Sequence, residues 1–300
     1  MTGATLAVTP ARGPRLTKWK GLLGSMISAV LFAGVLWRLR SAGWDRTVAL
    51  IPPGIGFWAA LLAFYFTLPV GEWWIYRRLW HLPARGLAPL LRKRISNDIL
   101  FGYSGEVYFY LWARAQPQLT QAPFGAVKDV NVTSALVAAG VTLAMVAAAT
   151  PWVGALDLGR FAQPLLWSSV ALASASLAIV VFGKRVFSLS RSELLSISAI
   201  HLVRLLATTL LLALVWHLAL PAVALSTWLL LATARMLIGR LPLIPNTDLV
   251  FATLTGVLVG PHNPIGDLLA TTTLLGLCLH VGVLIVLTGV DIVHARMADA

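Results

Sequence analysis

Residues 195–219 read LSISAIHLVRLLATTLLLALVWHLA, a run of apolar side chains with one permanent charge, at Arg204. At about 1.5 Å per residue, a helix over this run would cover the roughly 30 Å hydrocarbon core of a bilayer. The run therefore predicts a transmembrane helix. Similar runs recur along the rest of the chain, separated by short segments rich in proline, glycine and polar residues.

The composition of the whole chain is that of a membrane protein. Of its 300 residues, 58% are hydrophobic and 11% are charged, and the mean hydropathy is +0.83. We therefore expect an all-α, polytopic transmembrane bundle of about eight helices, with one or two broken or re-entrant elements. The seventh span is short, so it either crosses a thinned bilayer or re-enters. The predicted spans are residues 21–38, 54–76, 131–150, 163–183, 195–219, 222–239, 247–260 and 265–290.

Lysine and arginine concentrate in alternate segments between these spans. With the N-terminus in the cytoplasm, eighteen of the 23 basic residues fall in cytoplasmic segments and four in external ones. The positive-inside rule then predicts cytoplasmic N- and C-termini in a bacterial inner membrane. The net charge of +12 points to anionic lipid head groups as partners rather than to nucleic acid. We expect a basic N-terminal tail (1–20), one transmembrane domain (21–290) and a short C-terminal tail (291–300).

The segment after the second span fits neither a polar loop nor a clean span. Residues 85–94 predict a basic amphipathic helix, and the apolar, aromatic stretch 99–113 is interrupted at residues 102–106. We expect a helix–break–helix hairpin that dips into the membrane, where irregular backbone is tolerated only against protein or a water-filled cavity. The sequence NDILFG at 97–102 resembles TDLVFA at 247–252, which suggests an inverted repeat like those that form transporter sites.

Arg204 is the strongest functional candidate. A guanidinium at the centre of a span costs at least about 2.5–3.5 kcal/mol on insertion scales, so it requires a partner or a polar cavity. We expect it either to hold a lipid phosphate or to form a structural ion pair with an acidic residue such as Asp248 or Glu106. It belongs to a polar stripe at helical spacing that should face the bundle interior. The stripe consists of Ser198, His201, Arg204 and Thr208.

Glu106 is a second candidate, because it lies in a segment rich in tyrosine and phenylalanine. A carboxylate in dry surroundings is costly, so Glu106 should pair with a basic residue or take up a proton. The alternative is a water-exposed glutamate beside Arg114.

The turn from Pro242 to Asp248 is a third candidate. Asn246 suits the N-cap of the following helix and Asp248 its first turn, where free backbone N–H groups attract anions. The alternative is an ordinary capped turn at the membrane surface. Arg235 and Arg240 precede the turn, and we expect them to anchor the cytoplasmic side and to bind head groups.

The sequence lacks the common signatures of enzymes and metal sites. Its one cysteine, Cys278, lies in an apolar run, and no histidine–cysteine cluster has metal-binding spacing. No nucleophile elbow, nucleotide-binding loop or HExxH motif occurs. We therefore expect no metal, no cofactor and no enzymatic activity.

Taken together, the motifs resemble those of the flippase-like family of the lysylphosphatidylglycerol synthase transmembrane region, over roughly residues 20–290. The resemblance implies a lipid-handling role, and in these synthases a separate soluble domain carries the aminoacyl transfer, so we expect only the membrane half here. The chain departs from the family after Pro245, where relatives commonly continue with glycines and a glutamate. The matching elements are WWIYRR at 73–78, residues 87–94, Gly105-Glu106 before Tyr108 and Tyr110, and LPLIP at 241–245.

Three functions follow from these observations. The first is a transporter that moves an anionic or modified lipid, or a lipid-linked intermediate, between leaflets. The alternatives are a membrane-embedded enzyme of envelope lipid synthesis and a scaffold that does not transport. Besides membrane lipids, we expect a lipid-modifying membrane protein or a second copy of this chain as partners.

Overall fold

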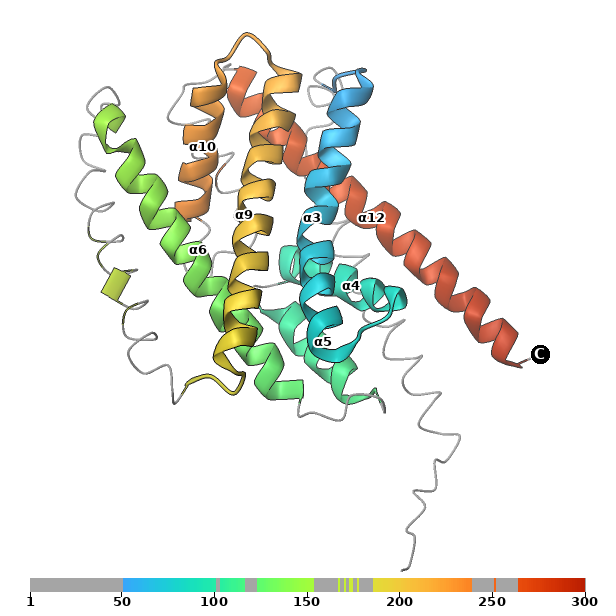
Figure 1. Ribbon diagram of the computed structural model, residues 1–300. Helices are drawn as coiled ribbons and strands as arrows, with labels where there is room; N and C mark the ends of the chain where they lie inside the picture. The colour runs from blue at the N-terminus through green and yellow to red at the C-terminus, as the bar shows by residue number, and fades with distance from the viewer. Residues whose placement is uncertain are drawn as a thin grey trace, which may run out of the picture.

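The computed structural model describes residues 51–100, 103–116, 123–153, 186–238 and 264–299, with isolated residues between 167 and 251. Every regular element among these residues is helical, as predicted (Figure 1). The elements are α3 (Ile55–Trp80), η1 (Ala84–Gly86), α4 (Leu87–Ile99), α5 (Ser104–Arg114), α6 (Pro123–Val153), α9 (Arg191–Ala219), α10 (Leu225–Ile238) and α12 (Pro264–Asp299).

Among the described residues, four helices are long and apolar enough to cross a membrane: α3, α9, residues 123–145 of α6 and residues 264–293 of α12. They correspond to the second, third, fifth and eighth predicted spans. Helix α10 matches the sixth, although its 14 described residues are short for a crossing. The predicted spans 21–38, 163–183 and 247–260 lie outside the described residues, apart from isolated positions.

Helices α3 and α9 form the centre of the bundle and run in opposite directions (Figure 1). Helix α6 lies against α9 on one side, and α10 packs on both of them. Helices α3 and α12 begin at the upper end of Figure 1, whereas α6 and α9 begin at the lower end. The predicted topology, with a cytoplasmic N-terminus and eight crossings, also requires α3 and α12 to run in one direction and α6 and α9 in the other.

Aromatic side chains fill the core at both ends of the α3–α9 pair. In one cluster, Trp216 of α9 lies 5.7 Å from Trp228 and 6.1 Å from Phe251, measured between ring centroids. In the other, Tyr76 of α3 lies 4.7 Å from both Trp80 and Phe109. The second cluster joins α3 to α5, so the short helices are part of the same packed body.

Helices α4 and α5 form a helix–break–helix hairpin, but the break was predicted too late in the sequence, because Ser104, Gly105 and Glu106 lie in the first turn of α5. The break ends at Tyr103, whose φ of 73° is left-handed, and α5 begins at the next residue. The basic amphipathic surface predicted over residues 85–94 is wrong in one respect. Arg92 and Lys93 are buried: Lys93 pairs with the buried Glu72, and Arg92 pairs with Asp291, whose own side chain is exposed.

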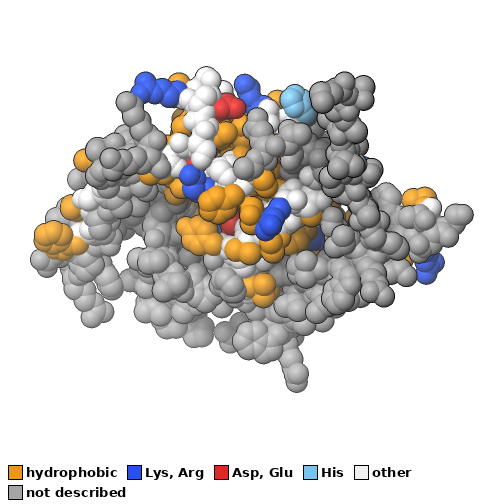
Figure 2. Space-filling view, turned by 90° about the horizontal axis from the view of Figure 1, so that it is seen from below, with side chains coloured by type: hydrophobic (Ala, Val, Ile, Leu, Met, Phe, Trp, Pro, Cys, Tyr) orange, Lys and Arg blue, Asp and Glu red, His pale blue; other side chains and the backbone are white. Residues whose placement is uncertain are grey.

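The lower end of the bundle carries exposed arginines and is called the basic end. Figure 2 looks onto it and shows Lys and Arg side chains beside hydrophobic ones. Such a mixture suits contact with anionic head groups. The exposed arginines of the basic end are Arg77, Arg78, Arg85, Arg114 and Arg191.

Helix α9 begins at the basic end with well-satisfied backbone groups. Ser190 caps the helix through a reciprocal capping box with Glu193. The segment before it is fixed by Asp129 of α6, a fully buried carboxylate that accepts hydrogen bonds from the amides of Ser188 (2.6 Å) and Leu189 (2.7 Å). These contacts set the start of the helix that carries Arg204.

Candidate functional site

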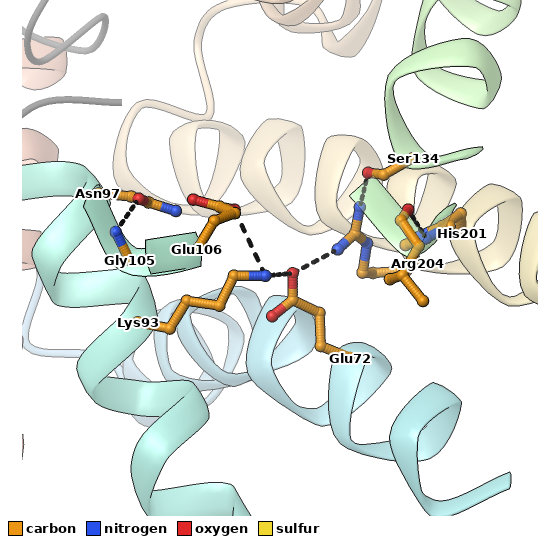
Figure 3. A network of polar contacts seen from close by, with 9 residues as sticks. Glu72, Lys93, Asn97, Gly105, Glu106, Ser134, His201 and Arg204 are labelled. Atoms are coloured by element: carbon orange, nitrogen blue, oxygen red, sulfur yellow. Dashed lines mark hydrogen bonds and ion pairs between the residues drawn. The ribbon is translucent and has the colours of Figure 1, made fainter. Parts of the chain in front are cut away.

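Four charged side chains meet between α3, α4, α5 and α9, and we call them the ion cluster: Glu72, Lys93, Glu106 and Arg204 (Figure 3). Glu72 lies at the centre. Its Oε1 atom is 2.8 Å from Lys93 Nζ and 3.7 Å from Arg204 Nη1. One carboxylate oxygen therefore faces two cations.

Lys93 links the two carboxylates of the cluster. Its ammonium is also 3.4 Å from Glu106 Oε1, and only 1% of its side chain is exposed. The four formal charges cancel, which a low-dielectric interior requires. The remaining carboxylate oxygens, Oε2 of Glu72 and of Glu106, are buried and accept no hydrogen bond from the described residues. The cluster therefore retains unused acceptor atoms.

Two glycines allow the helices to come this close. A Cβ atom on Gly71 would lie 2.7 Å from Cδ of Arg204, so the arginine stem occupies the space of the missing side chain. A Cβ atom on Gly105 would lie 2.1 Å from the carbonyl oxygen of Lys93. The amide of Gly105 also donates a hydrogen bond to Oδ1 of Asn97 at 2.7 Å, which connects the start of α5 to α4. The position of Glu106 next to Lys93 depends on this contact.

The polar side chains of the stripe on α9 differ in their partners: some bond to the neighbouring helix α6, and one bonds to the backbone of α9. Arg204 donates to Ser134 Oγ of α6 at 3.0 Å, and Nε2 of the buried His201 lies 3.2 Å from the Val130 carbonyl oxygen. The prediction that these two residues face the interior is confirmed. Thr208 instead donates to the backbone carbonyl of Arg204 at 2.7 Å, within its own helix. It holds no ligand-binding position in the cluster.

Of the two partners predicted for Arg204, Glu106 is not its partner in the structure. Glu72 pairs with Arg204, whereas Glu106 pairs with Lys93. The alternative of a surface glutamate beside Arg114 is also wrong, because Glu106 is mostly buried (18% exposed) and faces Lys93. Asp248 lies outside the described residues.

The remaining predicted residues lie away from the ion cluster. Arg235 is half-buried in the bundle and lines a small cavity of about 30 Å³ with Phe64 and Trp216. It is therefore not the surface anchor that was predicted. Arg240 and Asn246 lie outside the described residues.

Glu72 and Lys93 are the members of the ion cluster that the sequence interpretation missed. Glu72 lies inside the predicted span 54–76, and a carboxylate within a span is a candidate by the same rule that selected Arg204. Nothing in the sequence separates Lys93 from its neighbours Arg92 and Arg94. Its role depends on how the hairpin docks on α3.

A second polar network connects α3, α4 and α12. The Tyr65 hydroxyl lies 2.8 Å from Nδ1 of His280, whose Nε2 is 3.2 Å from Oδ2 of Asp98. Arg94 lies over the Tyr65 ring at 4.3 Å and 3.6 Å from Asp98. Both ring nitrogens of His280 are thus engaged, as expected of a structural histidine.

The ion cluster lies within the apolar part of the bundle. Glu72 precedes the end of α3 by eight residues, about 12 Å along the helix axis. The hairpin therefore carries Lys93 and Glu106 to the depth of residues in two predicted membrane spans. Among the described helices, no three His, Cys, Asp or Glu side chains gather as metal ligands would. The chemistry that the cluster offers is reversible ion pairing.

Comparison with known proteins identifies no relative. No protein-family model, no curated protein and no solved structure matches the chain. The resemblance to the flippase-like family therefore rests on the sequence motifs quoted above. The geometry of the ion cluster is the basis on which a function is inferred.

Proposed function

We propose that this protein is a flippase-like lipid transporter in a bacterial inner membrane, with its N-terminus in the cytoplasm. In this proposal the phosphate of a lipid head group binds Arg204 and Lys93 in place of Glu72. The observation that carries the proposal is that two buried cations share one carboxylate oxygen, Oε1 of Glu72. The resemblance to the flippase-like family points to the same class of function.

A phosphate is well suited to replace this carboxylate. Its oxygens can accept from both cations at once, whereas Oε1 of Glu72 lies 3.7 Å from Arg204, beyond hydrogen-bond distance. Arg204 would therefore gain a hydrogen bond as the lipid binds, and Lys93 would exchange its bond to Glu72 for one to the phosphate. Adding one phosphodiester charge to a neutral cluster leaves it at −1, so one proton on Glu72 or Glu106 would restore neutrality. Exchange between acid and lipid would make binding reversible.

The first prediction is that Arg204→Ala abolishes lipid translocation by purified protein in liposomes. The substitution removes one of the two cations and leaves Glu72 paired with Lys93, so we expect the protein to insert and fold, with lower stability because the cluster then carries a charge of −1. Translocation would be followed with fluorescent lipids that carry different head groups, beside far-UV circular dichroism and gel filtration.

Thr208→Val is the matched control, because Thr208 lies one turn further along α9 and bonds only to its own backbone. It should translocate lipid at the wild-type rate. Undiminished translocation by Arg204→Ala would contradict the proposal. A chemically altered lipid in the liposomes would favour the membrane enzyme, and no translocation of any lipid by folded wild-type protein would favour the scaffold.

A further inference from the structure

An open groove of about 190 Å³ lies between α3 and α9 at the basic end. Four polar side chains line it: Arg78 from α3, and Ser192, Glu193 and Ser196 from the first two turns of α9. The volume is below the roughly 300–1,000 Å³ of pockets that enclose a drug-sized ligand. The groove therefore suits a head group, with the lipid chains outside it.

The groove is on the same helix–helix seam as the ion cluster. Ile75 and Leu79, which line it, follow Glu72 by three and seven residues, and so share its face of α3. Ile200 and Ile197 precede Arg204 by four and seven residues on α9. The seam thus leads from the basic end to the buried cations.

The polar groups of the groove carry both signs of charge. Arg78 is exposed, and none of the described residues forms an ion pair or hydrogen bond with its guanidinium. Glu193 uses one oxygen, Oε2, to accept from the backbone N–H (2.8 Å) and the hydroxyl (2.7 Å) of Ser190. Its other oxygen, Oε1, is free of hydrogen bonds to the described part of the chain. A cation and a carboxylate acceptor are therefore both available to a ligand.

We propose that this groove is the docking site for a phospholipid whose head group carries both a phosphate and a primary ammonium. Arg78 binds the phosphate, Glu193 Oε1 accepts from the ammonium, and Ser196 supplies a hydroxyl donor. The isoleucine and leucine side chains on the seam contact the adjoining glycerol and chains. The assignment rests on the proposed function, because it names the lipid that the transporter would take up at the basic end.

The experiment measures lipid binding directly, without transport. Purified full-length protein in detergent is incubated with phosphatidylethanolamine, phosphatidylglycerol or phosphatidylcholine, and bound lipid is counted by native mass spectrometry. We expect phosphatidylethanolamine to bind best, since phosphatidylglycerol lacks the ammonium and the choline group has no N–H donor. Arg78→Gln should weaken its binding about tenfold, and Glu193→Gln should remove its advantage over phosphatidylglycerol. Glutamine preserves the capping box.

Arg77→Gln is the control, because Arg77 lies one position earlier at the basic end, over the Trp73 ring at 5.0 Å, and does not line the groove. An equal loss of binding in Arg77→Gln and Arg78→Gln would overturn the assignment, as would equal binding of the three lipids. Displacement of the lipid by equimolar glycerophosphoethanolamine would also overturn it, since a soluble head group would then suffice. Arg204→Ala should keep this binding and lose transport, so undiminished transport by Arg204→Ala with intact groove binding would refute the proposed role of the ion cluster alone.

Discussion

Glu72→Leu is expected to lower the free energy of unfolding by about 3–5 kcal/mol, the usual cost of removing one partner from a buried charge pair. The loss should be large here because two buried cations, Lys93 and Arg204, depend on the same carboxylate. The free energy of unfolding of Glu72→Gln should lie between those of the wild type and Glu72→Leu, since an amide oxygen still accepts a hydrogen bond. Unfolding in mixed micelles, followed by tryptophan fluorescence with increasing SDS, would measure the change.

The control is a double substitution, Glu72→Leu with Arg204→Leu. It removes one charge of each sign and leaves Lys93 paired with Glu106 at 3.4 Å, so the remaining cluster is neutral. We expect the double variant to be more stable than Glu72→Leu alone, which is strong non-additivity between contacting residues. Additive losses, or a single-variant loss below about 1 kcal/mol, would show that the four charges do not act as one cluster.

Gly105→Ala is expected to destabilise the hairpin by at least about 1–3 kcal/mol, the usual cost of overpacking. The added Cβ would lie 2.1 Å from the backbone carbonyl of Lys93, and a backbone atom cannot move without shifting α4. The sign of the stability change is informative, because replacing a glycine within a helix by alanine otherwise stabilises the protein by roughly 0.5–1 kcal/mol. Thermal unfolding of the purified protein would measure the effect.

Gly140→Ala on α6 is the matched control, because nothing lies within 4 Å of a Cβ atom there. It should be neutral or stabilising. If Gly105→Ala behaved in the same way, the close contact of α4 and α5 would be refuted, and with it the position of Glu106 beside Lys93.

The helical fold could be predicted because it follows from local sequence. The apolar run around Arg204 and the other long spans are set by bilayer thickness and helix rise, and four of them are long and apolar enough in the structure. The hairpin was predictable in outline, because residues 102–106 interrupt an apolar stretch, but Ser104 to Glu106 are helical and begin α5. Helix ends were less predictable: α6 begins eight residues before the predicted 131, and α12 continues through the expected tail to Asp299.

The site could be predicted only in part, because pairing is a tertiary property. Arg204 and Glu106 were found from their cost in apolar surroundings, but their partners were not. Three adjacent cations, Arg92, Lys93 and Arg94, look alike in sequence and have three different partners in the fold: Asp291, Glu72 and Asp98. Their assignment depends on the rotation of α4 against α3 and α12, which the local sequence does not encode.

The composition of the ion cluster implies an order of assembly during translation. Glu72 and Lys93 are 21 residues apart, so they can pair as soon as α3 and the hairpin have left the ribosome. With Glu106 included, this early group carries a charge of −1 until Arg204 follows, 98 residues after Glu106. At about 5–20 residues per second, that interval lasts roughly 5–20 s. The helix that bears the guanidinium thus enters the bilayer beside an anionic group already in place, which offsets its cost of insertion.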